Sequence, residues 1–278
     1  MHYFADIAVE AATLAGKQLL GNFRQHHASI YGADVFSVSN RSLSKEVTSS
    51  NDHEADKIII DLITDRCPDH DLLTEETGHI DNGSPYKWII DPLDGSSNFL
   101  NHNPFFAVSI CLAYEDVPIT GVIFAPFIEE MAVARKGQGC TINGRPVRVS
   151  ETTELSRTYI VGCPGGDPDN RRFARMEYAL HQKNKDFRKI GSAAVEAYMV
   201  AAGRVDAFTT LNISPWDVAA GALCTEEAGG RVSDFNGDPW QLDKTDMLVS
   251  NGLVHNAVLE EIQRAGIPGG VDSLAPVD

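Results

Sequence analysis

The stretch W-I-I-D-P-L-D-G-S-S-N-F, from Trp88 to Phe99, decides how this chain is interpreted. Its apolar beginning predicts a short buried strand that stops at Asp91-Pro92, because proline cannot donate a hydrogen bond to a neighbouring strand. Asp94 follows three residues after Asp91, and Gly95 permits an unusual backbone angle or a close approach of another segment. The stretch therefore predicts two carboxylates at the mouth of an apolar strand.

Two carboxylates in such a place are costly without a counterion. The free carbonyl of Leu93 and the hydroxyl of Ser96 add hard oxygen ligands, and the whole set suits Mg²⁺. Residues 96–98 predict a helical turn whose free N–H groups face an anion. A plain turn is the alternative, because Asp, Pro, Gly and Ser are all common turn formers. The D-x-x-D spacing does not fit the calcium loop of EF-hands, whose acids fall on alternate positions.

Other polar segments can be interpreted either as part of a binding site or as purely structural features. Glu75-Glu76 follows an apolar pair and could simply cap the next segment. Ser214 to Asp217 has the form of a helix capping box, so Asp217 need only bond the cap and favour the helix dipole. Ser49 to Asp52 has the same S-x-x-D form. Gly191 to Ala194 precedes a helix, where small residues suit either close approach of a substrate or close helix packing.

Hydrophobic periodicity outlines the elements of the fold. It predicts helices over residues 8–23, 52–66, 171–184, 192–202, 214–228 and 257–264. Apolar runs predict strands at 87–90, 107–114, 121–124, 131–134, 159–161 and 248–249, with a hairpin turn at Asn143-Gly144. Residues 30–46 are expected to form a loop or hairpin. Strands in the middle with mixed elements after them predict an α+β fold of layered sheets and helices.

Composition excludes several classes of protein. The 278 residues suffice for one large core or two lobes that share a core, and no apolar run reaches the ~18 residues of a membrane span. The formal net charge of -16 repels nucleic acid and anionic lipid, so neither nucleic acid nor a membrane is an expected partner. Five scattered cysteines without a C-x-x-C pair argue against a disulfide framework and a cysteine zinc site. The N-terminus does not look like a secretory signal, and a cytoplasmic location is expected.

The motifs together resemble those of the inositol monophosphatase family. The matching segments are Glu75-Glu76, Trp88 to Phe99, Gly191 to Ala194, and Trp216 to Gly221 followed by Glu227 to Gly230. The resemblance implies a layered α-β-α-β-α sandwich of the sugar-phosphatase type, usually a homodimer, with Mg²⁺ between the lobes and inhibition by lithium. It divides the chain into an N-terminal α+β lobe (1–150), a C-terminal α/β lobe (151–266) and a flexible tail (267–278).

The resemblance also implies roles for individual residues. The metal ligands would be Glu75, Asp91, the Leu93 carbonyl, Asp94 and Asp217, holding two to three Mg²⁺ ions. A hydrogen-bonded pair of Asp52 and Ser96 would act with Glu75 to activate a water. Contacts to the substrate would come from Asp94, Gly95, Ser96, Ser97, Gly191, Ser192, Ala193 and Asp217. The implied reaction is direct hydrolysis of a small phosphate monoester by metal-activated water.

Inositol 1-phosphate is the leading substrate prediction, and one position departs from it. Thr210 stands seven residues before Asp217, about where inositol-specific relatives carry a glutamate that binds a ring hydroxyl. Fructose 1,6-bisphosphate and a 3′(2′),5′-bisphosphate nucleotide are the alternative substrates. A covalent aspartyl-phosphate route is the chemical alternative, although that class typically spaces its acids D-x-D. A catalytically silent metal-binding protein on the same fold is the alternative from another class.

Overall fold

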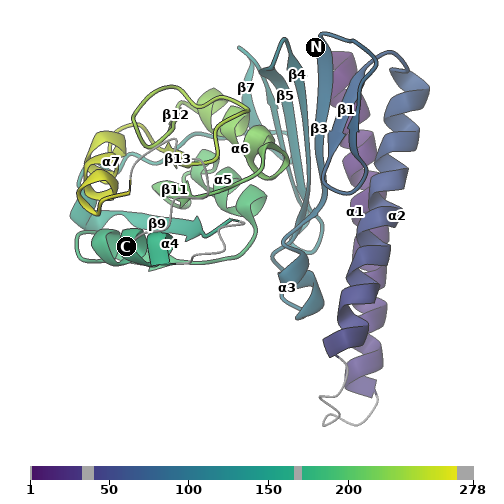
Figure 1. Ribbon diagram of the computed structural model, residues 1–278, viewed down its shortest axis with the longest axis horizontal. Coiled ribbons are helices and arrows are strands. Elements are labelled where there is room, and N and C mark those ends of the chain that lie inside the picture. Colours follow the sequence, from purple (N-terminus) through teal and green to yellow (C-terminus); the bar gives the residue numbers. More distant parts are fainter. Residues whose placement is uncertain (1, 33–40, 166–170, 268–278) are drawn as a thin grey trace.

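Helices and sheets alternate in five stacked layers (Figure 1). The computed structural model describes residues 2–32, 41–165 and 171–267. Helices α1 (His2–Gly32) and α2 (Arg41–Arg66) cover one face of an eight-stranded sheet. Helices α5 (Ala193–Ala201) and α6 (Pro215–Glu227) lie between this sheet and a five-stranded one, and α4 (Arg171–His181) and α7 (His255–Arg264) form the last layer. This α-β-α-β-α arrangement confirms the predicted layered fold.

The first sheet has the strand order β2-β1-β3-β4-β5-β6-β7-β8. Its strands are β1 (Asp71–Thr74), β2 (Gly78–Ile80), β3 (Tyr86–Asp94), β4 (Ala107–Tyr114), β5 (Val117–Ala125), β6 (Glu130–Arg135), β7 (Gly139–Ile142) and β8 (Arg145–Pro146). Strands β1 and β3 pair in parallel, whereas the other neighbours pair antiparallel. Consequently β1 and β3 end at the same edge of the sheet.

The second sheet has the order β10-β9-β11-β13-β12. It consists of β9 (Tyr159–Cys163), β10 (Asp186–Arg188), β11 (Ala207–Thr210), β12 (Arg231–Ser233) and β13 (Met247–Ser250). Each sheet is built from one half of the chain, but α5 and α6 contact both sheets. The two predicted lobes therefore share one interior, and their boundary at residue 150 stays a prediction.

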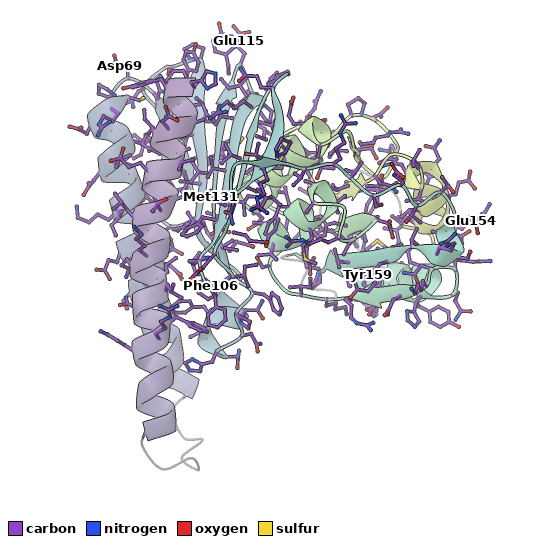
Figure 2. All side chains as sticks on the ribbon, turned by 180° about the vertical axis from the view of Figure 1, so that it is seen from behind. Asp69, Phe106, Glu115, Met131, Glu154 and Tyr159 are labelled. Carbon is purple, nitrogen blue, oxygen red and sulfur yellow. The ribbon has the colours of Figure 1, made fainter. Side chains whose placement is uncertain are left out.

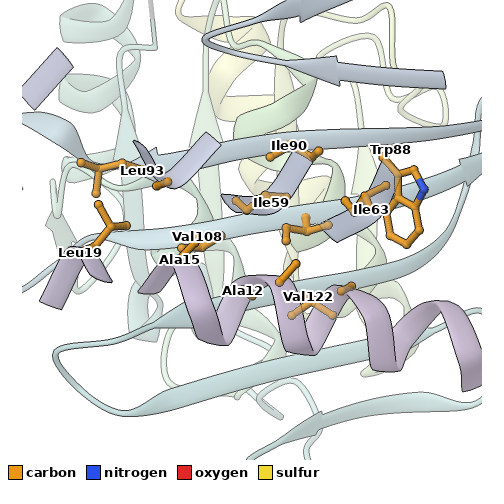
Figure 3. Packing of buried hydrophobic residues seen from close by; sticks show 14 of the residues in the cluster. Ala12, Ala15, Leu19, Ile59, Ile63, Trp88, Ile90, Leu93, Val108 and Val122 are labelled. Atoms are coloured by element: carbon orange, nitrogen blue, oxygen red, sulfur yellow. The ribbon is translucent and has the colours of Figure 1, made fainter. Parts of the chain in front are cut away.

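Small residues let α1 lie close to the first sheet. Ala12 and Ala15 are fully buried, and a Cβ added to Gly16 would lie 2.4 Å from Cδ1 of Phe124. Figure 3 shows the side chains that fill this interface, Leu19 from α1, Ile59 and Ile63 from α2, and Trp88, Ile90, Leu93, Val108 and Val122 from the sheet. Because each such buried side chain contributes roughly 1.5–3 kcal/mol, the packing holds α2 firmly beside the end of β3.

Two predicted boundaries are wrong. The loop expected over residues 30–46 is helical at both ends, because α1 continues to Gly32 and α2 begins at Arg41; residues 33–40 lie outside the described part. A polar sequence does not exclude a helix whose backbone hydrogen bonds are satisfied internally. Because α2 begins at Arg41, Asp52 lies in the interior of this helix. The interpretation of Ser49 to Asp52 as a cap at the start of a helix is therefore also wrong.

The strand expected to stop at Asp91-Pro92 continues to Asp94. Asp91 pairs with Ser109 and Asp94 pairs with Ala107, so three steps along β3 oppose two along β4. This is a β-bulge, which leaves one residue unpaired and so accommodates a proline without a backbone N–H. The bulge changes the direction of the last residues of β3, and with it the direction of the Asp94 side chain.

The remaining predicted strands and helices are confirmed within a few residues, and the weak strands were missed. Asn143 and Gly144 form the predicted turn between β7 and β8, with φ of 50° and 75°. Strands β1, β2, β10, β11 and β12 were not predicted, because each spans only three or four residues and is defined by its pairing partners. No helix among the described residues is long and apolar enough to cross a membrane. All five cysteines are buried and free.

His255, the first residue of α7, is enclosed by two serines. Its Nδ1 and Nε2 each lie 2.8 Å from a serine oxygen, Oγ of Ser250 and Oγ of Ser233 respectively. The side chain is fully buried, and this burial, reinforced by Arg231, lowers the pKa of His255 to about 4. The neutral imidazole thus joins α7 to two strands of the second sheet.

Acid should therefore weaken this part of the fold. The unfolded state binds a proton near pH 6.5 and the folded state only near pH 4, so stability falls as pH drops through this window, by about 3 kcal/mol at most. We expect His255→Gln to flatten the pH dependence of the unfolding free energy between pH 4 and 6.5. Urea denaturation at several pH values measures it, and an unchanged slope in the variant would contradict this role.

Candidate functional site

Three carboxylates from distant parts of the chain meet near the C-terminal end of β3. Glu75 follows β1, Asp91 lies on β3, and Asp217 is in the first turn of α6; one oxygen from each lies within 4.8 Å of the others. The parallel pairing of β1 with β3 brings Glu75 beside Asp91, and the Glu75 N–H continues this pairing by donating to the Ile90 carbonyl at 3.1 Å. Figure 2 labels Phe106 at this end of the sheet, with Asp69 and Glu115 at the other end.

The electrostatics of the cluster favour a bound cation. Burial, followed by repulsion from Glu75, Asp94 and Asp217, raises the pKa of Asp91 well above its ordinary value. Burial and the charge of Asp94 raise the pKa of Asp217 to about 7, and partial burial raises that of Glu75. Such shifts mean that the carboxylates resist losing their protons together. An all-oxygen donor set of this kind fits a hard divalent cation such as Mg²⁺.

Asp217 both caps helix α6 and belongs to the carboxylate cluster, the two roles that the sequence allowed. Its Oδ2 accepts a hydrogen bond from the Ser214 N–H at 3.1 Å, as a capping residue does. The same carboxylate nevertheless belongs to the three-residue cluster. The cap therefore fixes the side chain that the cluster uses.

Asp94 lies beside this cluster and is directed at the second half of the chain. Its carboxylate accepts hydrogen bonds from the Ser192 hydroxyl and from the N–H groups of Ala193 (3.2 Å) and Ala194 (3.0 Å). Burial, partly opposed by these hydrogen bonds, raises the pKa of Asp94 to about 6. Two sequence motifs are thus joined, and three of the predicted substrate contacts lie together. The metal-binding role of Asp94 stays a prediction.

The turn after β3 depends on Gly95. Its φ is 84°, and an added Cβ would lie 2.8 Å from the Phe105 carbonyl oxygen and 3.1 Å from Cβ of Ser192. The short helix α3 (Ser96–Leu100) follows directly, so Ser96 and Ser97 form the predicted helical turn. The Leu93 N–H donates to Asp91 Oδ1 at 2.9 Å and fixes this carboxylate. Only glycine allows the chain to turn here while touching the other half.

Asp52 lies on α2, close enough to Glu75 and Glu76 for their charges to act on it. Burial and the charges of Glu76 and Glu75 raise its pKa to about 8. Among the described residues, no hydrogen bond joins Asp52 to Ser96, and Asp52 Oδ1 is buried without a hydrogen-bond partner. The proposed pair of Asp52 and Ser96 therefore stays a prediction.

Two buried acids next to the site were missed by the sequence analysis. Asp56 accepts hydrogen bonds from the hydroxyls of Thr77 (2.6 Å) and Thr74 (3.4 Å), on either side of Glu75-Glu76. Glu196 accepts from the backbone of the turn before α5. Asp56 lies one helical turn after Asp52, and Glu196 lies one helical turn after Ser192. This spacing puts each acid on the same side of its helix as a predicted site residue. Neither belongs to a recognised motif, so neither was noticed.

Thr210, which departs from the inositol-type pattern, is fully buried. Its hydroxyl accepts a hydrogen bond from the Cys163 thiol at 3.4 Å. The position therefore offers no carboxylate to a substrate, and its hydroxyl is already engaged within the second sheet.

A family model, related sequences and solved structures all match this chain over most of its length. The inositol monophosphatase family model matches residues 1–266. A protein of Thermotoga maritima named fructose-1,6-bisphosphatase/inositol-1-monophosphatase is 36% identical over 85% of this chain and 90% of its own length. The Nus factor SuhB of Salmonella typhimurium is 35% identical over 95% of this chain and 97% of its own. The solved inositol monophosphatase from Anabaena is 33% identical and superposes with a TM-score of 0.82, covering 95% of this chain and 96% of the other.

Removal of one carboxylate should change how the fold responds to metal. In metal-free protein, Asp91→Asn should be at least as stable as wild type, because it relieves repulsion and keeps the oxygen that Leu93 bonds. Saturating Mg²⁺, at roughly 100 times its Kd, should stabilise wild type by about 2.7 kcal/mol and the variant much less. Thermal unfolding of EDTA-treated protein, with and without MgCl₂, measures both effects.

The matched control is Asp61→Asn, which alters an exposed carboxylate paired with Lys57. It should respond to Mg²⁺ like wild type. Equal stabilisation of Asp91→Asn and wild type would rule out Asp91 as a ligand.

Proposed function

Because the chain belongs to the inositol monophosphatase family and is a phosphoric monoester hydrolase, we propose that it hydrolyses inositol 1-phosphate to inositol and phosphate with the aid of Mg²⁺. The observation that carries the proposal is the convergence of Glu75, Asp91 and Asp217 from three separate elements. Lithium inhibition and a homodimer belong to the same proposal and rest on the family resemblance, and the cytoplasmic location expected from the sequence is proposed with them.

In the proposed mechanism the protein holds the reacting groups in place. Bound Mg²⁺ would supply an activated water and neutralise charge on the phosphate. The ligands would be Glu75, Asp91, the Leu93 carbonyl, Asp94 and Asp217. Glu75 is exposed to solvent, so its carboxylate, together with Asp52, would accept the proton of the attacking water.

The phosphate would lie at the start of α3 and the alcohol at the start of α5, two segments that meet at Asp94. The amides of Gly95, Ser96 and Ser97 at the start of α3 would bind phosphate oxygens. The alcohol part would contact Gly191, Ser192 and Ala193 at the start of α5. Asp94 joins the two sets through its hydrogen bonds to Ser192 and Ala193.

Fructose 1,6-bisphosphate is the second candidate substrate. The buried Thr210 leaves one potential contact to an inositol hydroxyl unfilled. The Thermotoga relative carries both activities in its name. A bisphosphate nucleotide is the third candidate, and it rests on the family resemblance alone.

A non-catalytic role is the candidate from another class. The Salmonella relative is named a Nus factor. The net charge of -16 argues against direct contact of this chain with nucleic acid, so a protein partner would fit such a role better. Retention of every predicted acidic ligand favours catalysis as the main activity.

Phosphate release with Mg²⁺ should distinguish these candidates. The substrates are inositol 1-phosphate, fructose 1,6-bisphosphate and 3′-phosphoadenosine 5′-phosphate, each with and without lithium. We expect the highest kcat/KM with inositol 1-phosphate and inhibition by lithium. A clear preference for fructose 1,6-bisphosphate would transfer the assignment to the second candidate, and inactivity on all three would favour the non-catalytic role.

The same assay tests the chemistry at Asp91. Its replacement by Asn should lower kcat at least about a hundredfold, because even changes to groups that only support a metal ligand cost 10–100-fold. The fold should be unaffected, as circular dichroism would show. With a substrate made chiral at phosphorus by oxygen isotopes, direct attack by water should invert the configuration; retention would favour a covalent aspartyl-phosphate intermediate, because that route makes two displacements.

A further inference from the structure

Glu196 is a fully buried carboxyl group behind the proposed site. Its Oε1 accepts hydrogen bonds from the N–H groups of Ile190 (2.6 Å) and Gly191 (3.0 Å). Its Oε2 is buried and has no hydrogen-bond partner among the described residues. A carboxyl group in this position carries a large desolvation cost, which one neutral apolar residue would avoid. The feature that an apolar residue could not supply is the pair of hydrogen bonds from the Ile190-Gly191 turn to the Glu196 carboxyl group.

This turn is also held from the other half of the chain. Asn98 on α3 donates from Nδ2 to the Ile190 carbonyl at 2.9 Å and to the Phe105 carbonyl at 2.7 Å. Gly191 adopts a φ of 85°, and an added Cβ would lie 3.3 Å from Asn98 Nδ2. The turn is therefore clamped between Asn98 and Glu196, with its amides bonded on one side and a carbonyl on the other.

The clamped turn leads directly into the start of α5. Ser192 is the N-cap of this helix, and its hydroxyl is bonded to Asp94. The next two backbone N–H groups, of Ala193 and Ala194, also donate to Asp94. A shift of the turn would move all three donors at once and would rotate the Asp94 carboxylate.

We propose that Glu196 is a positioning residue which, by holding the Ile190-Gly191 turn, sets the orientation of the Asp94 carboxylate in the site. The inference rests on the proposed function, in which Asp94 binds metal and substrate. Glu196 itself touches neither. Burial is the main reason that the pKa of Glu196 is raised to about 8, with the two amides opposing the shift. Glutamine therefore reproduces the shape, the acceptor oxygen and the neutral charge of the protonated side chain.

The test compares Glu196→Ala, Glu196→Gln and a control. The control, Glu130→Ala, removes a carboxylate that accepts hydrogen bonds from Tyr198 on α5 and from Arg204, away from the clamped turn. The measurements are Mg²⁺ affinity by calorimetric titration, kcat and KM for the best substrate of the panel, and melting temperature. Calorimetry reports on the site even in an enzyme whose turnover is lost.

We expect Glu196→Ala to weaken Mg²⁺ binding about 10–100-fold, as loss of a supporting group does at other metal sites, and to lower kcat/KM. Glu196→Gln should stay within about threefold of wild type, because it keeps the acceptor. Glu130→Ala should lower the melting temperature while leaving Mg²⁺ affinity unchanged, which separates positioning from general stability.

Two results would overturn the inference. One is wild-type Mg²⁺ affinity and kcat/KM in Glu196→Ala, whatever its melting temperature. The other is equal impairment of Glu196→Gln and Glu196→Ala, which would show that the acceptor contact is not the cause. Should Glu196→Ala fail to fold, Glu196→Asp, which withdraws the carboxyl group from the turn, takes its place with the same criteria. Inactivity of the wild type on every substrate would refute the proposed function, while Mg²⁺ affinities would still decide the role of Glu196.

Discussion

Repulsion among the converging carboxylates of Glu75, Asp91 and Asp217, of which Asp91 is fully buried, is the constraint on which the rest of the site depends. Each group has a raised pKa, so the folded chain brings them together at an electrostatic cost. Hydrophobic packing of α1 and α2 on the sheet supplies the stability that offsets this cost. A divalent cation would convert the repulsion into attraction, which is why the cluster fits a metal-dependent phosphatase.

Backbone features of the first sheet place these charges. Parallel pairing of β1 with β3 is unusual in a sheet that is otherwise antiparallel, and it carries Glu75 to the same edge as Asp91. The bulge at Pro92 and Leu93 then turns Asp94 towards α5. The carboxylates of Glu75, Asp91 and Asp94 thus lie close together but have different surroundings, although Asp91 and Asp94 are only three residues apart in the chain.

The two halves of the chain meet through close backbone approach. A Cβ at Gly95 would collide with the Phe105 carbonyl oxygen and crowd Ser192, and a Cβ at Gly191 would crowd the Asn98 side chain. Asp94, Asn98 and Glu196 tie the same segments by hydrogen bonds. The proposed phosphate and alcohol contacts are therefore parts of one structure, which explains why motifs far apart in sequence form a single site.

The sequence by itself determined the layered fold, the strong helices and strands, and the acids of the D-P-L-D-G-S motif, because periodicity and turn chemistry are local properties of the chain. Glu75 and Asp217 could be assigned only through the family resemblance, since each also fits a capping role on its own. Tertiary structure alone decided the helical ends within residues 30–46, the bulge at Pro92, the convergence of Glu75, Asp91 and Asp217 from three separate elements, and the clamp at Glu196. The physical reason is that pairing of strands, burial of charge and closure of a turn between two halves depend on partners that are remote in sequence.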